Sequence, residues 1–262
     1  MPETTNDRPL GLAAYGAGKT FLVKGQESVA LSGVDLEIPR GEFVSVIGPS
    51  GCGKSTLLRI FADLTDATSG TVIVDDVSPR EARSQRRLGV VFQSPNLMPW
   101  RSVLRNVGLP LEIAGAAREQ RDQTSRELLS LVGLDGFERH QPRQLSGGMQ
   151  QRVSIARALS TEPDVLLMDE PFGALDEITR DRLNLELMSI WSRLRPTILF
   201  ITHSIAEAVY LSNRVVVMAA DPGRVVRIVD VDLPQPRSAE VRDDPRFHEL
   251  QSEIRGLLAG AP

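Results

Sequence analysis

The sequence predicts an α/β fold built around a parallel sheet, and three observations support this prediction. Several stretches are apolar at every position, which is typical of strands buried on both faces of a parallel sheet. A largely apolar stretch, Phe43–Ile47, runs into a glycine-rich loop that opens a helix, an order common in α/β folds. The chain has 262 residues, enough for one large domain or for a core that carries an inserted lobe.

The same patterns place the strands along the chain. They are predicted near Leu36–Ile38, Phe43–Ile47, Thr71–Val74, Gly89–Phe92, Asp164–Met168, Thr197–Ile201 and Val215–Met218. The region between Gln93 and Thr161 is mainly helical in character and is broken by glycine and proline. We therefore interpret residues 94–160, with approximate bounds, as a helical insertion into the core.

A long helix is predicted over Glu177–Leu194, where apolar side chains recur every three or four residues and would form a buried face. These side chains are Leu183, Leu187, Ile190, Trp191 and Leu194. Residues 1–10 are predicted to be a disordered lead. Residues 241–262 are predicted to be a short helical tail, with Phe247–Leu258 as its amphipathic part.

Composition narrows the class of protein. The net charge is −4, which gives no electrostatic reason to expect nucleic acid as the main partner. The single cysteine, Cys52, excludes an internal disulfide and fits a reducing compartment. No apolar run approaches the roughly 18 residues needed to span a bilayer, and the polar N-terminus lacks the apolar core of a signal peptide. We therefore expect a cytosolic protein that reaches a membrane only by docking on another protein.

A phosphate-binding loop is predicted directly after Phe43–Ile47. It consists of Gly48, Pro49, Ser50, Gly51, Cys52, Gly53, Lys54, Ser55 and Thr56. The glycines allow backbone N–H groups to turn toward an anion, and the following helix adds its positive N-terminal end. Lys54, one of only three lysines in the chain, can place its ammonium on the outer phosphates. Ser55 can offer its hydroxyl to Mg²⁺.

Two acids follow the apolar strand Asp164–Met168. Asp169 stands at the strand tip, where it can complete the Mg²⁺ shell directly or through water. Glu170 is one residue further and points away from Asp169, so we interpret it as the general base for an attacking water.

A second anion site is predicted at Ser146, Gly147 and Gly148, which precede a strong helix. Serine is a preferred N-cap, and the exposed N–H groups of a helix start attract anions. A second phosphate site far from the first in sequence makes sense if it faces a nucleotide held by another copy of the chain. The pattern therefore predicts a two-copy enzyme.

Together these motifs resemble the nucleotide-binding subunit of an ATP-binding cassette (ABC) transporter, in order and spacing, from about Gly18 to about Leu258. The resemblance implies a P-loop NTPase fold: a RecA-like core with an inserted α-helical subdomain and a small antiparallel β portion. It implies a cassette domain over residues 11–240 with ATP and Mg²⁺ as cofactors.

The resemblance also assigns roles to four further side chains. Phe21 resembles the aromatic that stacks on adenine, with Tyr15 as a competitor. Gln93 resembles the glutamine that senses Mg²⁺ and the transmembrane partner. Asp176 belongs to the D-loop, and His203 resembles the switch histidine that contacts the γ-phosphate.

Further segments resemble the importer branch for nitrate, sulfonate and taurine. They are residues 96–100, 176–180, 221–226 and 232–237. The resemblance implies a homodimer on the cytoplasmic face of the membrane, bound to permease subunits and served indirectly by an extracytoplasmic solute-binding protein. Pro99 and Trp100 would lie near the permease, where Trp100 is either an anchor for a partner helix or a local hydrophobic plug.

Two positions depart from the family pattern. Met149 stands at the fifth signature position, where the general pattern has glutamine, and Asp63 stands where glycine is usual. Because backbone groups and Ser146 would carry phosphate recognition, we expect Met149 to be tolerated. No physical reason for Asp63 is evident from the sequence.

Two alternative functions remain open at the level of sequence. One is a soluble cassette ATPase that remodels nucleic acid or ribosomes. The acidic charge, the single cassette and the short interval between the two phosphate motifs argue against it. The other is a cassette coupled to a membrane complex that does not transport, against which only the importer-like segments argue.

Overall fold

The computed structural model describes residues 9–235 and 237–260, and the fold below is that of these residues. Residues 1–8 of the predicted lead and residues 261–262 of the predicted tail lie outside them. Leu10, which was predicted to belong to this lead, instead begins a strand that pairs with one neighbour on each edge.

The larger sheet has the strand order β5-β6-β7-β3-β8-β9. All its neighbouring pairs are parallel except β8 and β9, which are antiparallel. The strands are β3 (Phe43–Ile47), β5 (Leu88–Val91), β6 (Val165–Asp169), β7 (Thr197–Ile201), β8 (Arg214–Ala219) and β9 (Arg224–Asp230). The predicted parallel sheet is confirmed, whereas β9 was not predicted.

A second, antiparallel sheet has the order β2-β1-β4. Its strands are β1 (Leu10–Val23), β2 (Gln26–Pro39) and β4 (Ser69–Val74). The sequence pattern marks only the end of β2 and most of β4. It misses β1 because this strand is rich in glycine and alanine and carries irregularities in its register.

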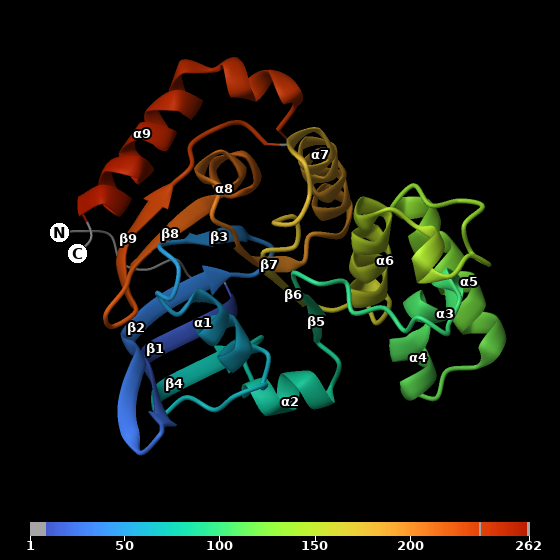
Figure 1. Ribbon diagram of the computed structural model, residues 1–262, viewed down its shortest axis with the longest axis horizontal. Helices are drawn as coiled ribbons and strands as arrows, with labels where there is room; N and C mark the ends of the chain where they lie inside the picture. The colour runs from blue at the N-terminus through green and yellow to red at the C-terminus, as the bar shows by residue number, and fades with distance from the viewer. Residues whose placement is uncertain (1–8, 236, 261–262) are drawn as a thin grey trace.

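The alternation of side chains along the parallel strands explains why they are mostly apolar on both faces. In β3, Phe43 and Ile47 join one core cluster, whereas Val44 and Val46 join the other. The second cluster surrounds α1 (Lys54–Phe61), which lies between the two sheets (Figure 1). The first contains residues of α6 (Gly147–Leu159), α7 (Glu177–Leu194), α8 (Ile205–Leu211) and α9 (Pro245–Gly260) on the opposite face.

The region predicted as a helical insertion forms a lobe beside the sheet (Figure 1). It contains α3 (Val103–Val107), α4 (Leu109–Ile113), α5 (Arg118–Leu131), a short 3₁₀ turn (Pro142–Gln144) and α6. A further short helix, α2 (Pro79–Ser84), joins β4 to β5, and a second 3₁₀ turn (Ala239–Asp243) precedes α9. In α9, Phe247, Leu250 and Ile254 are buried on the core.

The predicted helix over Glu177–Leu194 is confirmed as α7, with one correction to its buried face. Leu183, Leu187, Ile190 and Trp191 are buried, but Leu194 is 51% exposed. Leu194 is the last residue of the helix, and Arg195 ends it in the left-handed conformation. The chain therefore turns away before Leu194 can pack.

The structure supplies a physical account of Asp63. This residue follows the last turn of α1 with φ 54°, a left-handed conformation in which glycine is favoured and aspartate is tolerated better than most residues. Its carboxylate accepts a hydrogen bond from Arg83 Nε of α2 at 2.7 Å. Compared with glycine, aspartate is less favourable in this backbone conformation, but it adds an ion pair between α2 and the end of α1.

Candidate functional site

The glycine-rich loop connects β3 to α1 and is shaped by glycine at two positions. Gly51 and Gly53 have φ of 82° and 89°. A Cβ on Gly53 would lie 2.5 Å from Leu31 Cδ2 and 2.8 Å from Ala30 O, so no larger residue fits there without a shift. The loop is therefore a close-packed backbone cradle of the kind that binds phosphate.

Lys54 lies inside this cradle. Its side chain is buried, and Nζ donates to the backbone oxygens of Gly48 at 2.8 Å and Pro49 at 3.0 Å. Cys52 Sγ lies 3.7 Å from the same ammonium and is itself buried in the loop. The ammonium is thus held against the backbone of the loop.

Ser55 and Asp169 meet although they lie far apart in sequence. Ser55 Oγ donates to Asp169 Oδ1 at 2.9 Å. Burial raises the pKa of the Asp169 carboxyl, the hydrogen bond from Ser55 lowers it, and the nearby Glu170 raises it. A hydroxyl beside a half-buried carboxylate is a donor set that suits Mg²⁺, which usually takes one or two protein ligands and completes its shell with phosphate and water. Among the described residues no cluster of three His, Cys, Asp or Glu side chains offers a closed metal site.

Glu170 and His203 form the next part of the site. Glu170 Oε2 lies 3.5 Å from His203 Nδ1, and Glu170 has φ 44°, a left-handed conformation at the turn after β6. Its backbone N–H donates to Ile201 O of β7 at 3.0 Å, which fixes the turn against the strand that leads to His203. The carboxylate is 27% exposed, so water can reach it.

Gln93 approaches the same place from β5. A Cβ added to Gly173 would lie 3.5 Å from both Gln93 Nε2 and Glu170 Oε2. The strand order explains this convergence. β5, β6, β7 and β3 are consecutive neighbours in a parallel arrangement, and the residues that follow their carboxyl ends therefore meet at one edge of the sheet.

The pattern analysis missed the residues that support the His203 loop. Thr202 Oγ1 donates to the buried carboxyl of Glu207, and Ser204 N donates to Thr202 Oγ1 at 3.0 Å. Burial raises the pKa of Glu207. The sequence did contain a pattern that indicates these residues. Ser204 caps α8, and Glu207 stands three residues later, which is the spacing of a capping box at the start of a helix.

Ser146, Gly147, Gly148 and Asp176 lie in a second group, at the N-terminal ends of α6 and α7. Ser146 Oγ accepts from Met149 N at 3.3 Å, and Asp176 Oδ1 accepts from Thr179 N at 2.9 Å. A Cβ on Gly148 would lie 2.9 Å from Thr179 Cγ2, so the two helix starts are packed together. Ser146 caps its helix as predicted and is exposed.

The two candidates for base stacking lie on β1. Phe21 is exposed, and Lys19 Nζ lies 5.0 Å from the centre of its ring. Tyr15 is also exposed, and its hydroxyl donates to Glu37 at 2.8 Å. The choice between them stays a prediction.

The chain is similar to known proteins along most of its length. A model of the ABC transporter family matches residues 31–173. A taurine import ATP-binding protein of Rhizobium johnstonii is 48% identical, with 87% of this chain and 88% of the relative covered. An aliphatic sulfonates import ATP-binding protein of Bacillus cereus is 41% identical, with 91% and 92% covered. A nitrate import ATP-binding protein of a Synechocystis strain is 43% identical, with 92% of each covered.

Solved structures agree with this relationship. A dimeric bacterial ABC transporter cassette has a TM-score of 0.76 and 35% identity, with 85% of this chain and all of that chain covered. The same cassette in a dimeric post-hydrolysis state, bound to ADP and phosphate, gives the same values. By sequence, by fold and by the grouping of its motifs, the chain belongs to the ATP-binding proteins of the ABC transporter family.

Proposed function

We propose that this chain binds and hydrolyses ATP to energise the import of a small solute of the taurine, sulfonate or nitrate class through a membrane permease. One observation carries the catalytic part: the phosphate loop, the Ser55–Asp169 pair and the Glu170–His203 pair lie at the ends of neighbouring strands. The three related import ATP-binding proteins, for taurine, aliphatic sulfonates and nitrate, support the transport part.

The proposed site divides the work of hydrolysis among its side chains. The loop from Gly48 to Thr56 cradles the phosphates, and Lys54 gives its ammonium to the outer ones. Ser55, Asp169 and Gln93 would hold Mg²⁺, which supplies positive charge against the phosphate oxygens when bound. The site of this cation is a proposal that rests on the chemistry of its donors.

Glu170 accepts the proton of the attacking water, since its carboxylate is reachable by solvent and is held at the turn after β6. His203 lies 3.5 Å from this carboxylate and faces the position of the γ-phosphate, where it donates a hydrogen bond as charge builds on the oxygens. Both side chains act only when the phosphate loop holds its ligand in line with the water.

We propose that two copies form the active unit. Ser146, Gly147 and Gly148 of each copy cover the nucleotide bound to the other copy, with Asp176 close to the contact. Their distance in the fold from the phosphate loop supports this arrangement: α6 starts in the helical lobe, whereas α1 lies between the sheets (Figure 1). The dimeric form of the related cassette supports it too.

The surface around Trp100 is the proposed docking site for the permease. Trp100 is 72% exposed, which argues against a buried hydrophobic plug. It borders a groove of about 790 Å³ whose charged lining comprises five arginines and three acids, namely Arg101, Arg105, Arg118, Arg121, Arg139, Glu112, Asp122 and Glu138. This excess of positive charge favours a permease segment that carries carboxylates beside an apolar contact for the indole.

The proposed location is the cytoplasmic face of the membrane, with a solute-binding protein on the other side as an indirect partner. Across residues 9–235 and 237–260, no helix has both the length and the apolar character that crossing a bilayer requires. We propose that the permease holds the chain at the membrane.

Gentle purification of a tagged Glu170→Gln variant from detergent-solubilised membranes of its host, with ATP present, tests the proposal. We expect a multi-span permease to co-purify and its genetic neighbours to narrow the solute. Trp100→Ala in the same background should lose the permease, whereas Ile178→Ala, which removes an exposed apolar side chain of α7, should keep it. Recovery of ribosomes, of DNA or of no membrane protein would overturn the transport assignment.

A further inference from the structure

A loop without helix or strand joins the catalytic edge of the sheet to the exposed Trp100. It runs from Gln93, after β5, to Ser102, before α3. At one end, the Gln93 amide and the Glu170 carboxylate both lie next to Gly173, and the other end carries the 72% exposed indole. A loop of this length bends freely unless its backbone groups are bound. The side chains that bind its backbone therefore determine whether its two ends move together.

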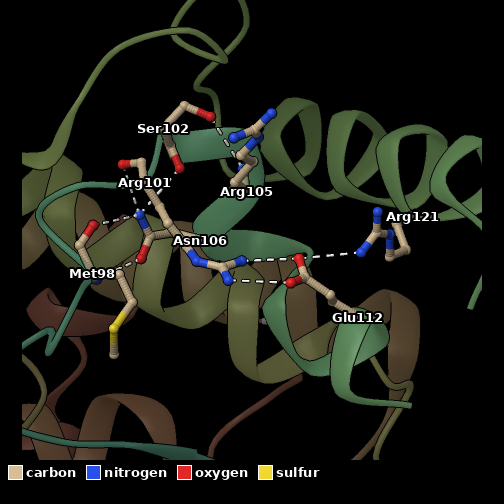
Figure 2. A network of polar contacts seen from close by, with 7 residues as sticks. All are labelled: Met98, Arg101, Ser102, Arg105, Asn106, Glu112 and Arg121. Atoms are coloured by element: carbon tan, nitrogen blue, oxygen red, sulfur yellow. Dashed lines mark hydrogen bonds and ion pairs between the residues drawn. The ribbon is translucent and has the colours of Figure 1, made fainter. Parts of the chain in front are cut away.

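Asn106 holds the half of the loop that carries Trp100. This buried side chain of α3 accepts from Met98 N at 2.7 Å. Its amide nitrogen faces three carbonyl oxygens, those of Met98 and Arg101 at 3.2 Å and of Ser102 at 3.1 Å. Figure 2 shows these contacts closing around one side chain. A single residue therefore fixes the backbone on both sides of Trp100.

Arg157 holds the other half, next to Gln93. It lies in the last turn of α6, and its guanidinium donates to Pro95 O at 2.7 Å and to Asn96 O at 2.8 Å. Asn96 has φ 49°, a left-handed turn that brings its carbonyl to the arginine. Gln151, also in α6, donates to Phe92 O at 3.2 Å. One helix thus binds the backbone before and after Gln93.

The residue next to Trp100 is tied to the lobe as well. The Arg101 guanidinium makes two contacts with the Glu112 carboxylate, at 2.9 and 3.1 Å, and Arg121 of α5 reaches the same carboxylate at 3.1 Å (Figure 2). The hydrogen bond from Arg101 is the main cause that lowers the pKa of Glu112. The loop is therefore anchored in α3, α4, α5 and α6.

We propose that Asn106 and Arg157 are positioning residues that make residues 93–102 a rigid connector, so that a displacement of Gln93 is transmitted to Trp100. This inference rests on the proposed function, in which Gln93 responds to the bound nucleotide and Trp100 contacts the permease. Without the two side chains, φ and ψ changes within the loop would absorb the displacement before it reached the indole.

Fluorescence of Trp100 tests the connector without the permease. The chain has two tryptophans, so Trp191→Phe leaves Trp100 as the sole reporter in an otherwise full-length protein. We expect Mg²⁺ with a slowly hydrolysed ATP analogue to change Trp100 emission and anisotropy. Asn106→Ala and Arg157→Lys should lose most of this change while the analogue binds with unchanged affinity.

A matched control separates positioning from a merely structural role. Val107→Ala removes a buried side chain from the same short helix but none of the loop contacts above, so it should lower stability and keep the fluorescence response. Trp191 is a core residue, so Trp191→Phe changes the packing of the core. Hydrogen–deuterium exchange on the chain that keeps Trp191 provides a second measurement without that change. Asn106→Ala should speed exchange of the Met98 amide, and Val107→Ala should not.

The outcomes distinguish the connector from the function on which it rests. If the parent, the Trp191→Phe protein, fails to bind the analogue, the proposed function and the connector are both refuted. A parent that binds it but shows no response at Trp100, or an Asn106→Ala variant that keeps the full response, would overturn the connector and leave the ATPase assignment intact.

Discussion

Replacing Glu170 by glutamine tests the assignment of the general base with little change to the fold. The substitution keeps the size of the side chain and removes its ability to take a proton. The ion-pair contact of this carboxylate is with His203, at 3.5 Å, and both side chains are partly open to solvent. A contact of this kind contributes about 0–1 kcal/mol, so we expect the free energy of unfolding to change by no more than that.

The effect on turnover should be much larger than the effect on stability. A positioned general base contributes about 10²–10⁴-fold to a rate, and each tenfold step corresponds to about 1.4 kcal/mol of activation free energy. The variant should therefore lose about 3–5 kcal/mol of transition-state stabilisation. Nucleotide affinity should be retained, because the cradle and Lys54 are untouched.

The assay combines single-turnover hydrolysis with equilibrium binding of Mg-ATP. The matched control is Glu177→Gln, which removes an exposed acid at the start of α7 and should leave the rate unchanged. If Glu170→Gln hydrolyses ATP at a rate close to that of the parent, the proton must go elsewhere, and Glu170 is not the base.

Three further outcomes are expected. Asp63→Ala should be about 1 kcal/mol less stable than Asp63→Gly in chemical unfolding, because alanine disfavours the left-handed conformation. Both variants lose the ion pair with Arg83, which is weak because Arg83 is 57% exposed. Equal stabilities of the two variants would contradict this account. Glu207→Gln should be more stable than the parent at pH 7 but not below about pH 4.5. The raised pKa means that folded Glu207 binds its proton more tightly than unfolded Glu207, so the parent loses stability as pH rises from 4.5 to the folded pKa. Urea unfolding at several pH values measures this, and a gain that is constant with pH would show that ionisation is not its source. Ser146→Arg should leave binding of ATP to the monomer intact and abolish hydrolysis by the dimer, and full hydrolysis by a strictly monomeric form would refute the two-copy scheme.

Much of the site could be predicted because most of its residues follow strands that are buried on both faces. β3, β6 and β7 are apolar on both faces since each face packs on a different core cluster, so the strands and the polar residues at their ends are visible in the sequence. What the sequence does not contain is the strand order. That order brings Gln93, Glu170 and His203 to one edge, and it depends on tertiary pairing alone.

The long hairpin of β1 and β2 was largely missed for a different physical reason. Every residue in its outer half, from Phe21 to Val29, is exposed. This half therefore lacks the alternation of apolar and polar positions that identifies a strand in a sequence. β9 escaped prediction because it is an edge strand with few buried side chains. Asn106 and Arg157 could not have been predicted at all, since their partners in the loop are backbone N–H and C=O groups, which nearly every residue offers.

The contacts of Arg157 and Asn106 also locate the boundary between core and lobe more closely than the sequence can. Both residues belong to helices of the lobe, and together they hold the backbone from Pro95 to Ser102, so this part of the loop moves with the lobe. β5, which ends at Val91, pairs with β6 in the sheet. Because Gln151 of α6 also holds Phe92 O at 3.2 Å, the change from sheet to lobe falls between Val91 and Phe92, and Gln93 lies on the lobe side of it. In the proposed function, a displacement of Gln93 would therefore pass through this bound stretch to the surface that carries Trp100.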